Sequence, residues 1–143
     1  MALPWSARSP EWDLIVNAYE VSSGCVSSRL DGWISPHASE WLLEQTEVFL
    51  GAGAKFIVFE CDRLAMFNTP AVGFFMETRR RLKRVDGFLA LVRLKSEAKE
   101  KLLLSGPTAV FSVFEAKGDA IKALEADSRA WAAEADRRPK EQK

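Results

Sequence analysis

The sequence predicts a single α/β domain with a mixed, mostly parallel sheet of about five strands packed with about four helices. A length of 143 residues fits one domain of ordinary size. Hydrophobic residues make up 48% and charged residues 28%, which is the composition of a chain that folds. After an initial pair of strand-like runs, strands and helices alternate. The predicted order is therefore β-β-α-β-α-β-α-β-α, with right-handed crossovers in the parallel part.

The first elements are a hairpin and a helix. Leu14–Glu20 alternates apolar and polar residues, and Cys25–Leu30 is a second strand-like run after a Ser-Ser-Gly turn. Two strands joined by so short a turn are expected to pair antiparallel. Ser39–Leu50 has apolar residues near helical spacing, and Gly51 ends that helix.

The middle of the chain holds a buried strand and a well-marked helix start. Lys55–Glu60 is a short apolar run rich in β-branched and aromatic residues, which favours a strand covered on both faces. Asn68 or Thr69 can cap the following helix, and Pro70 suits its first turn. One stripe of this helix is expected to carry Val72, Phe75, Met76, Arg79 and Leu82, with Phe74 on the side away from it.

The basic run at residues 79–84 falls at the C-terminal end of that helix, where cations complement the helix dipole, so we interpret it as a solvated helix end. The remaining expected elements are a strand, a short helix, a strand and a last helix, at Phe88–Leu94, Ser96–Leu104, Phe111–Phe114 and Asp119–Ala135. The domain is thus placed at residues 13–128, between an N-terminal extension (1–12) and a charged C-terminal tail (129–143).

Charge and cysteine content exclude several classes of protein. Lys plus Arg equals Asp plus Glu, at 20 each, so no overall field attracts nucleic acid or an anionic membrane. No apolar stretch approaches the roughly 20 residues of a membrane span, and we expect no membrane insertion. Cys25 and Cys61 lie in apolar strand-like runs, and we expect buried thiols in a reducing cytoplasm.

Catalytic and metal-binding patterns are weak. The single histidine, His37, has no nucleophile or orienting group at a plausible spacing, and no His, Cys and carboxylate cluster has the spacing of a metal site. Glu60 and Asp62 follow a strand but lack the further carboxylates a cation site needs, so we expect turn and surface residues. The tryptophans are expected to be packing residues, and Trp33, in a loop after a strand, is the one we single out for a functional role. We therefore predict a protein that is not an enzyme and needs no cofactor.

Four segments together resemble the STAS domain, the fold of anti-sigma factor antagonists and of the cytoplasmic ends of sulfate transporters. Residues 29–35 look like its strand and glycine segment, and residues 56–64 look like its central strand and loop. Residues 66–73, MFNTPAVG, fall where the family has Asp-Ser-Ser-Gly-Leu-Gly. Residues 106–114 with the apolar pairs after them resemble its closing strand and helix.

The chain departs from this pattern at its best-known site. Asn68 replaces an aspartate, Ala71 replaces a glycine, and Ser35 stands where an aspartate is common. Pro70 falls at the serine that partner kinases phosphorylate in the family. The resemblance therefore implies the fold but leaves this chain without that phosphate acceptor. Thr69 is the nearest hydroxyl, and we expect it to be a minor acceptor at most.

The function implied by this resemblance is protein binding in bacterial signalling, with a serine kinase or anti-sigma factor as the partner and a homodimer as a further option. We expect the partner surface to include Asp62, Leu64, Asn68, Thr69, Pro70, Ala71 and Phe74. Phe74 is the expected exposed anchor, because aromatic residues are enriched among interface hot spots. Two alternatives stay open: a scaffold or transporter-accessory STAS subunit, and a nucleotide or small-ligand site at the helix start after Thr69.

Overall fold

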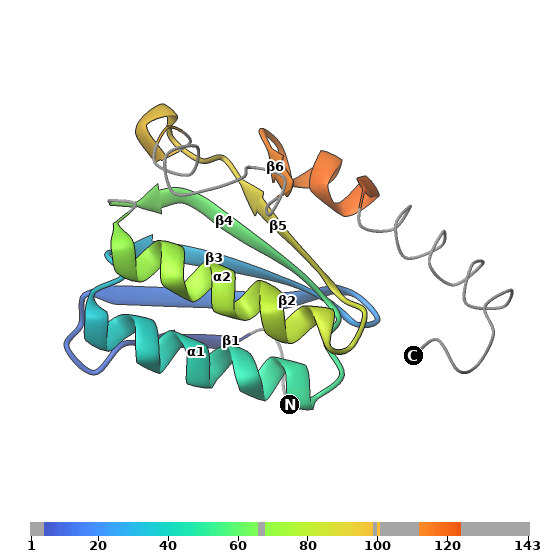
Figure 1. The fold of residues 1–143 in the computed structure, drawn as a ribbon, viewed down its shortest axis with the longest axis horizontal. Coiled ribbons are helices and arrows are strands. Elements are labelled where there is room, and N and C mark those ends of the chain that lie inside the picture. The colour runs from blue at the N-terminus through green and yellow to red at the C-terminus, as the bar shows by residue number, and fades with distance from the viewer. Residues whose placement is uncertain (1–4, 66–67, 99, 101–111, 124–143) are drawn as a thin grey trace, which may run out of the picture.

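A computed structural model of the chain describes residues 5–65, 68–98, 100 and 112–123. Two helices, α1 and α2, lie side by side against one face of a six-stranded sheet and run in the same direction (Figure 1). The bounds of the elements are β1 (Trp5–Arg8), β2 (Leu14–Ser22), β3 (Cys25–Gly32), α1 (Pro36–Gly51), β4 (Phe56–Leu64), α2 (Thr69–Lys83), β5 (Phe88–Val92) and β6 (Ser112–Phe114).

The strands lie in the sheet in their order along the chain, from β1 to β6. β1, β2 and β3 pair antiparallel, and β3 to β6 pair parallel, which confirms the predicted hairpin and the mixed, mostly parallel sheet. The sheet has six strands instead of the expected five. The additional strand is β1, whose residues we had placed in an N-terminal extension. A strand of four residues is too short for its sequence pattern to be distinguished from a loop. In the structure Trp5 pairs with Ala18 and packs edge to face on Phe49, with ring centroids 5.4 Å apart.

The main core lies between the helices and the sheet. Its centre is an aromatic cluster of Phe59 from β4 with Phe74 and Phe75 from α2, whose ring centroids lie 5.2 to 5.4 Å apart in edge-to-face arrangements. Aliphatic residues from both layers surround these rings, among them Leu14, Val16, Leu30, Leu42, Leu82 and Leu91. Burial on this face fixes how α1 and α2 are rotated against the sheet.

The opposite face of the sheet carries a smaller core. Residues 117–123 are helical, and Ala120 from this segment packs on Cys25, Val58 and Ala90. The last helix was expected from residue 119; its predicted remainder lies outside the described residues. Likewise, residues 96–98 and 100 of the helix expected at 96–104 are helical, and the rest of it is not described.

Both cysteines are buried thiols that form no disulfide, as predicted. Burial raises the pKa of the Cys61 thiol to about 12, so this group stays protonated at neutral pH. A protonated thiol is a poor nucleophile and a poor metal ligand. Cys61 is therefore a packing residue of the main core.

Glu60 was expected at the surface after the strand, and this prediction is wrong. β4 continues to Leu64, so Glu60 lies within the strand and is only 8% exposed. Ser27 on the neighbouring strand donates a hydrogen bond to Glu60 Oε2 at 2.9 Å, and Lys117 Nζ lies 3.5 Å from the same oxygen. A buried carboxylate requires such partners, because an unpaired one would be strongly destabilising.

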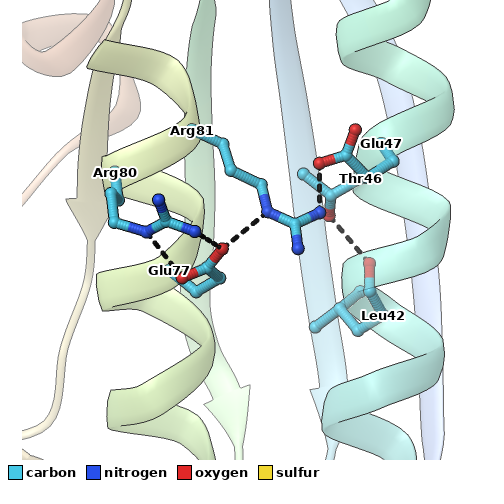
Figure 2. Close-up of polar contacts among 6 residues, drawn as sticks. All are labelled: Leu42, Thr46, Glu47, Glu77, Arg80 and Arg81. Atoms are coloured by element: carbon cyan, nitrogen blue, oxygen red, sulfur yellow. Dashed lines mark hydrogen bonds and ion pairs between the residues drawn. The ribbon is translucent and has the colours of Figure 1, made fainter. Parts of the chain in front are cut away.

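Charged side chains join the two helices on their outer side (Figure 2). Arg80 and Arg81 in α2 both donate hydrogen bonds to Glu77, with Nε to oxygen distances of 2.9 and 2.8 Å, and Arg81 also pairs with Glu47 of α1. Two cations of the basic run are thus engaged with carboxylates. Arg80, Lys83 and Arg84 are exposed, as expected of a solvated helix end, whereas Arg81 is half-buried and links α2 to α1.

Candidate functional site

The start of α2 is built as its sequence predicts. Asn68 is the N-cap: its backbone is extended, and its Oδ1 accepts a hydrogen bond from the Ala71 amide at 3.2 Å. Thr69 is the first helical residue and is exposed, and Pro70 follows in the first turn. Proline is well tolerated here because amides of the first turn have no partner within the helix. The helix therefore begins with a fixed backbone and one exposed hydroxyl.

The start of α1 lies beside the start of α2. Ser39, in the first turn of α1, donates a hydrogen bond to the Pro70 carbonyl oxygen at 3.3 Å. α1 itself begins at Pro36, three residues earlier than predicted, because Ser35 is its N-cap and accepts from the Ala38 amide at 3.0 Å. The Ser-Pro pair is a start signal of the same kind as Asn-Thr-Pro, and it could have been found from the sequence. The two helix starts form one end of the molecule (Figure 1).

A carboxylate fixes the cap of α1 to the hairpin. Asp13 accepts hydrogen bonds from the hydroxyls of Ser35 and Ser9, and the Trp33 amide donates to the Asp13 carbonyl oxygen at 2.8 Å. Partial burial raises the pKa of Asp13, but the hydrogen bonds from Ser35 and Ser9 outweigh it, so the pKa lies below its usual value. The spacing of these residues did not predict the contact between Asp13 and Ser35, because strands β2 and β3 separate the two residues along the chain.

The predicted partner-binding residues divide between surface and core. Thr69 is exposed, and Asn68 and Pro70 are half-buried at the helix start. Leu64 and Ala71 are buried in the main core, so neither can contact a partner in this conformation.

The prediction that Phe74 is an exposed anchor is wrong, because its side chain is 1% exposed. The buried face of α2 is Ala71, Phe74, Phe75, Thr78 and Leu82, while Met76 from the predicted stripe is 47% exposed. α2 contacts both α1 and the sheet, and the buried arc is wide enough to take both phenylalanines.

Asp62 lies on the other face of the sheet from α2. Its Oδ2 is 3.5 Å from Arg29 Nη2 and 3.9 Å from Arg93 Nη1, on the face where Glu60 meets Lys117. Along a strand successive side chains point to opposite faces, which separates Asp62 from the core residue Cys61. The structure therefore brings Asn68, Thr69 and Pro70 together and leaves Asp62 out of this site.

The described residues offer little catalytic chemistry. Within ranges 5–65, 68–98, 100 and 112–123, no group of three or more His, Cys, Asp and Glu side chains could hold a metal ion. His37 is exposed, and its Nε2 lies 3.8 Å from a carboxylate oxygen of Glu11. No helix in the described part of the chain is long and apolar enough to cross a membrane.

Solved structures with the same fold include anti-sigma factor antagonists. The phosphorylated form of SpoIIAA, a cell fate determinant of Bacillus, matches with a TM-score of 0.63 and 22% identity, covering 76% of this chain and 98% of that one. An anti-sigma factor antagonist from Mycobacterium paratuberculosis matches with a TM-score of 0.69 and 14% identity, over 83% of this chain and 99% of that one. At these identities the likeness shows the fold.

A transporter also carries this fold. The murine anion transporter Slc26a9 matches with a TM-score of 0.60 and 13% identity, over 85% of this chain and 22% of that one. A comparison with curated proteins finds no match. The sequence profile of the STAS domain matches residues 18–120, most of the chain, and the chain belongs to the STAS domain family.

Proposed function

We propose that this chain is a protein-binding regulator of the anti-sigma factor antagonist type, whose partner contacts the start of α2. The observation that carries the proposal is the fixed helix start at Asn68, Thr69 and Pro70, which is accessible beside the start of α1. Nearly the whole length of two anti-sigma factor antagonists corresponds to this chain. The proposed partner is a serine kinase or an anti-sigma factor.

The direct test is a titration of purified anti-sigma factors of the source organism into the purified chain by isothermal calorimetry. Thr69→Glu adds a charge at the start of α2, and we expect it to weaken binding at least about tenfold. Val48→Ala is the matched control, because Val48 is an exposed apolar residue in the last half of α1. Absence of binding by every anti-sigma factor, and by every serine kinase titrated in the same way, or equal binding by Thr69→Glu, would contradict the proposal.

Regulation is proposed to differ from that of a phosphorylated relative. The Bacillus SpoIIAA structure is of a phosphorylated form. By resemblance, the accepting serine corresponds to Pro70, which has no hydroxyl. A phosphate adds a charge of about −1.5 to −2, which is enough to remove a partner from this surface. We expect this chain to bind its partner without such a switch at residue 70, and to accept phosphate on Thr69 only weakly.

Incubation with the cognate kinase and ATP, followed by intact-mass measurement, tests this regulation. We expect little phosphate on the wild-type chain and full phosphorylation of Pro70→Ser. Thr69→Ala is the control that assigns any residual phosphate. Full phosphorylation of Thr69 in the wild type, together with loss of partner binding, would show that the switch is present one residue earlier.

A second candidate function is association with an anion transporter, because the Slc26a9 match covers most of this chain. In that case the chain would bind a membrane protein instead of an anti-sigma factor. Co-purification with each class of partner from cells of the source organism separates the two functions. A thermal-shift measurement with nucleotides tests the small-ligand alternative at the start of α2, where free amides favour anions.

A further inference from the structure

The turn between β1 and β2 holds a tryptophan in a strained and exposed position. Trp12 has a φ of 63°, in the left-handed region that bulky residues rarely adopt. Its side chain is 71% exposed, more than that of any other large hydrophobic residue whose exposure the structure describes. Neither backbone preference nor burial explains a tryptophan at this position. Strained residues of this kind persist where the surrounding structure fixes them, and they gather at functional sites.

Hydrogen bonds fix the turn on both sides of Trp12. The Trp12 amide donates to the Ser9 carbonyl oxygen at 2.9 Å, and the Ser9 amide donates to the Leu14 carbonyl oxygen at 2.8 Å. The Leu14 amide donates to Ser9 Oγ at 3.0 Å. Asp13 then ties the turn to the loop before α1, through Ser35 Oγ and the Trp33 amide. The indole of Trp12 is therefore presented by a rigid backbone, so little conformational entropy is lost when it is covered.

The surroundings of Trp12 combine apolar surface with an unpaired cation. Arg8 Cζ lies 4.5 Å from the centroid of the Trp12 ring, and Arg8 is exposed. Arg8 makes no ion pair with a carboxylate in the part of the chain that the structure describes. The nearby Glu11 lies 3.8 Å from His37. Trp33, whose amide donates to the Asp13 carbonyl oxygen of the same turn, is a second tryptophan that is 40% exposed. Tryptophan and arginine are the residue types most enriched among interface hot spots.

We propose that Trp12, Arg8 and Trp33 form a docking surface for an acidic segment of a partner protein. An apolar side chain of the partner packs on the Trp12 indole, and a partner carboxylate pairs with Arg8. Charge complementarity selects an acidic occupant, because Arg8 is the exposed cation against the ring. The two carboxylates of the turn face elsewhere: Glu11 lies 3.8 Å from His37, and Asp13 accepts from Ser9 and Ser35. The inference rests on the proposed protein-binding function and adds a second contact to the same end of the molecule.

Thermal unfolding of the chain alone tests the claim that the surrounding structure holds Trp12 in a backbone conformation that tryptophan disfavours. Asparagine adopts the left-handed region more readily than other non-glycine residues. We therefore expect Trp12→Asn to keep or raise the thermal midpoint. Trp5→Asn is the contrast, because Trp5 packs on Phe49, and we expect its midpoint to fall. A fall in the midpoint of Trp12→Asn by more than about 5 °C would overturn the inference, because it would make Trp12 a packing residue.

A photo-crosslinking amino acid placed at residue 12, and in a control chain at Val48, identifies the occupant in cells of the source organism. The captured protein is then purified and titrated into the wild type, Trp12→Asn and Arg8→Glu. We expect each substitution to weaken binding at least about tenfold, with the Arg8→Glu effect largest at low salt. No adduct at residue 12, an adduct at Val48 alone, or binding by both variants within about twofold of the wild type would overturn the inference.

The same experiment separates this inference from the proposed function. If the captured partner is neither an anti-sigma factor nor a serine kinase, and no protein of those two classes binds the start of α2, the docking surface stands and the proposed function fails. If an anti-sigma factor binds the start of α2 but the Trp12 and Arg8 variants bind it as the wild type does, only the docking surface fails.

Discussion

Replacing Phe74 by alanine should strongly lower the free energy of unfolding of the domain, because Phe74 is a core residue and not an interface residue. Phe74 is 1% exposed, and its ring packs edge to face on Phe59 and Phe75 at centroid distances of 5.4 and 5.2 Å. Truncating a buried phenylalanine typically costs about 3–5 kcal/mol, because apolar contacts are lost and a cavity remains. Since small domains unfold with about 5–15 kcal/mol, this is a large fraction of the total. Phe74→Glu would leave an unpaired carboxylate in the core, and we expect that variant not to fold.

Urea denaturation followed by circular dichroism measures this loss, with the slope checked to confirm that both chains unfold in the same way. The matched control is Met76→Ala in the same helix, whose side chain is 47% exposed and whose loss should change stability by less than about 0.5 kcal/mol. If Phe74→Ala stays within about 1 kcal/mol of the wild type, the rotation of α2 described here is wrong. In that case Phe74 would be exposed and could serve as the partner-binding anchor expected from the sequence.

Three further predictions concern burial, backbone and charge. The two buried cysteines should resist iodoacetamide in the native chain and react in urea, as mass measurement would show. Gly32→Ala should lower the free energy of unfolding by about 2 kcal/mol or more, because φ is 123° and a Cβ would lie 2.3 Å from the Asp13 carbonyl oxygen; an unchanged urea midpoint would contradict this. Hydrogen bonds from Arg80 and Arg81 lower the pKa of Glu77 to about 2. The ionised Glu77 carboxylate therefore stabilises the folded chain fully above the ordinary pKa of glutamate, and this stabilisation is lost as pH falls toward about 2. The thermal midpoints of the wild type and Glu77→Gln should accordingly converge in acid.

Local signals in the sequence were sufficient for the elements that position the site. Asn68, Thr69 and Pro70 predict a helix start because capping and proline preferences act within a few residues. The Ser-Ser-Gly turn predicted the β2–β3 hairpin in the same way, and the run at β4 was identified by its β-branched and aromatic residues. The alternation of strands and helices predicted a mostly parallel sheet, but the order of the strands within it was not predicted, because local patterns alone do not determine it.

Features that depend on packing between distant segments could not be predicted. Phe74 and Phe75 are adjacent, and a single helical stripe was expected to bury only one of them; both are buried because α2 contacts α1 as well as the sheet. Glu60 was assigned to the surface because its partner Ser27 lies 33 residues away. The exposed side chain and left-handed backbone of Trp12 lie beside the Asp13 contact to the α1 cap, and neither feature is visible in a window of sequence.

The measurement that tests the central claim most directly is a chemical-shift titration of the isotope-labelled chain with its anti-sigma factor partner. Backbone amides of residues 68–72 and the first turn of α1 should shift or broaden most, because the partner is proposed to contact these helix starts. Amides at the C-terminal ends of both helices should change little. Saturable shifts confined to those C-terminal ends, or to the face that carries Asp62, with residues 68–72 unaffected, would contradict the account.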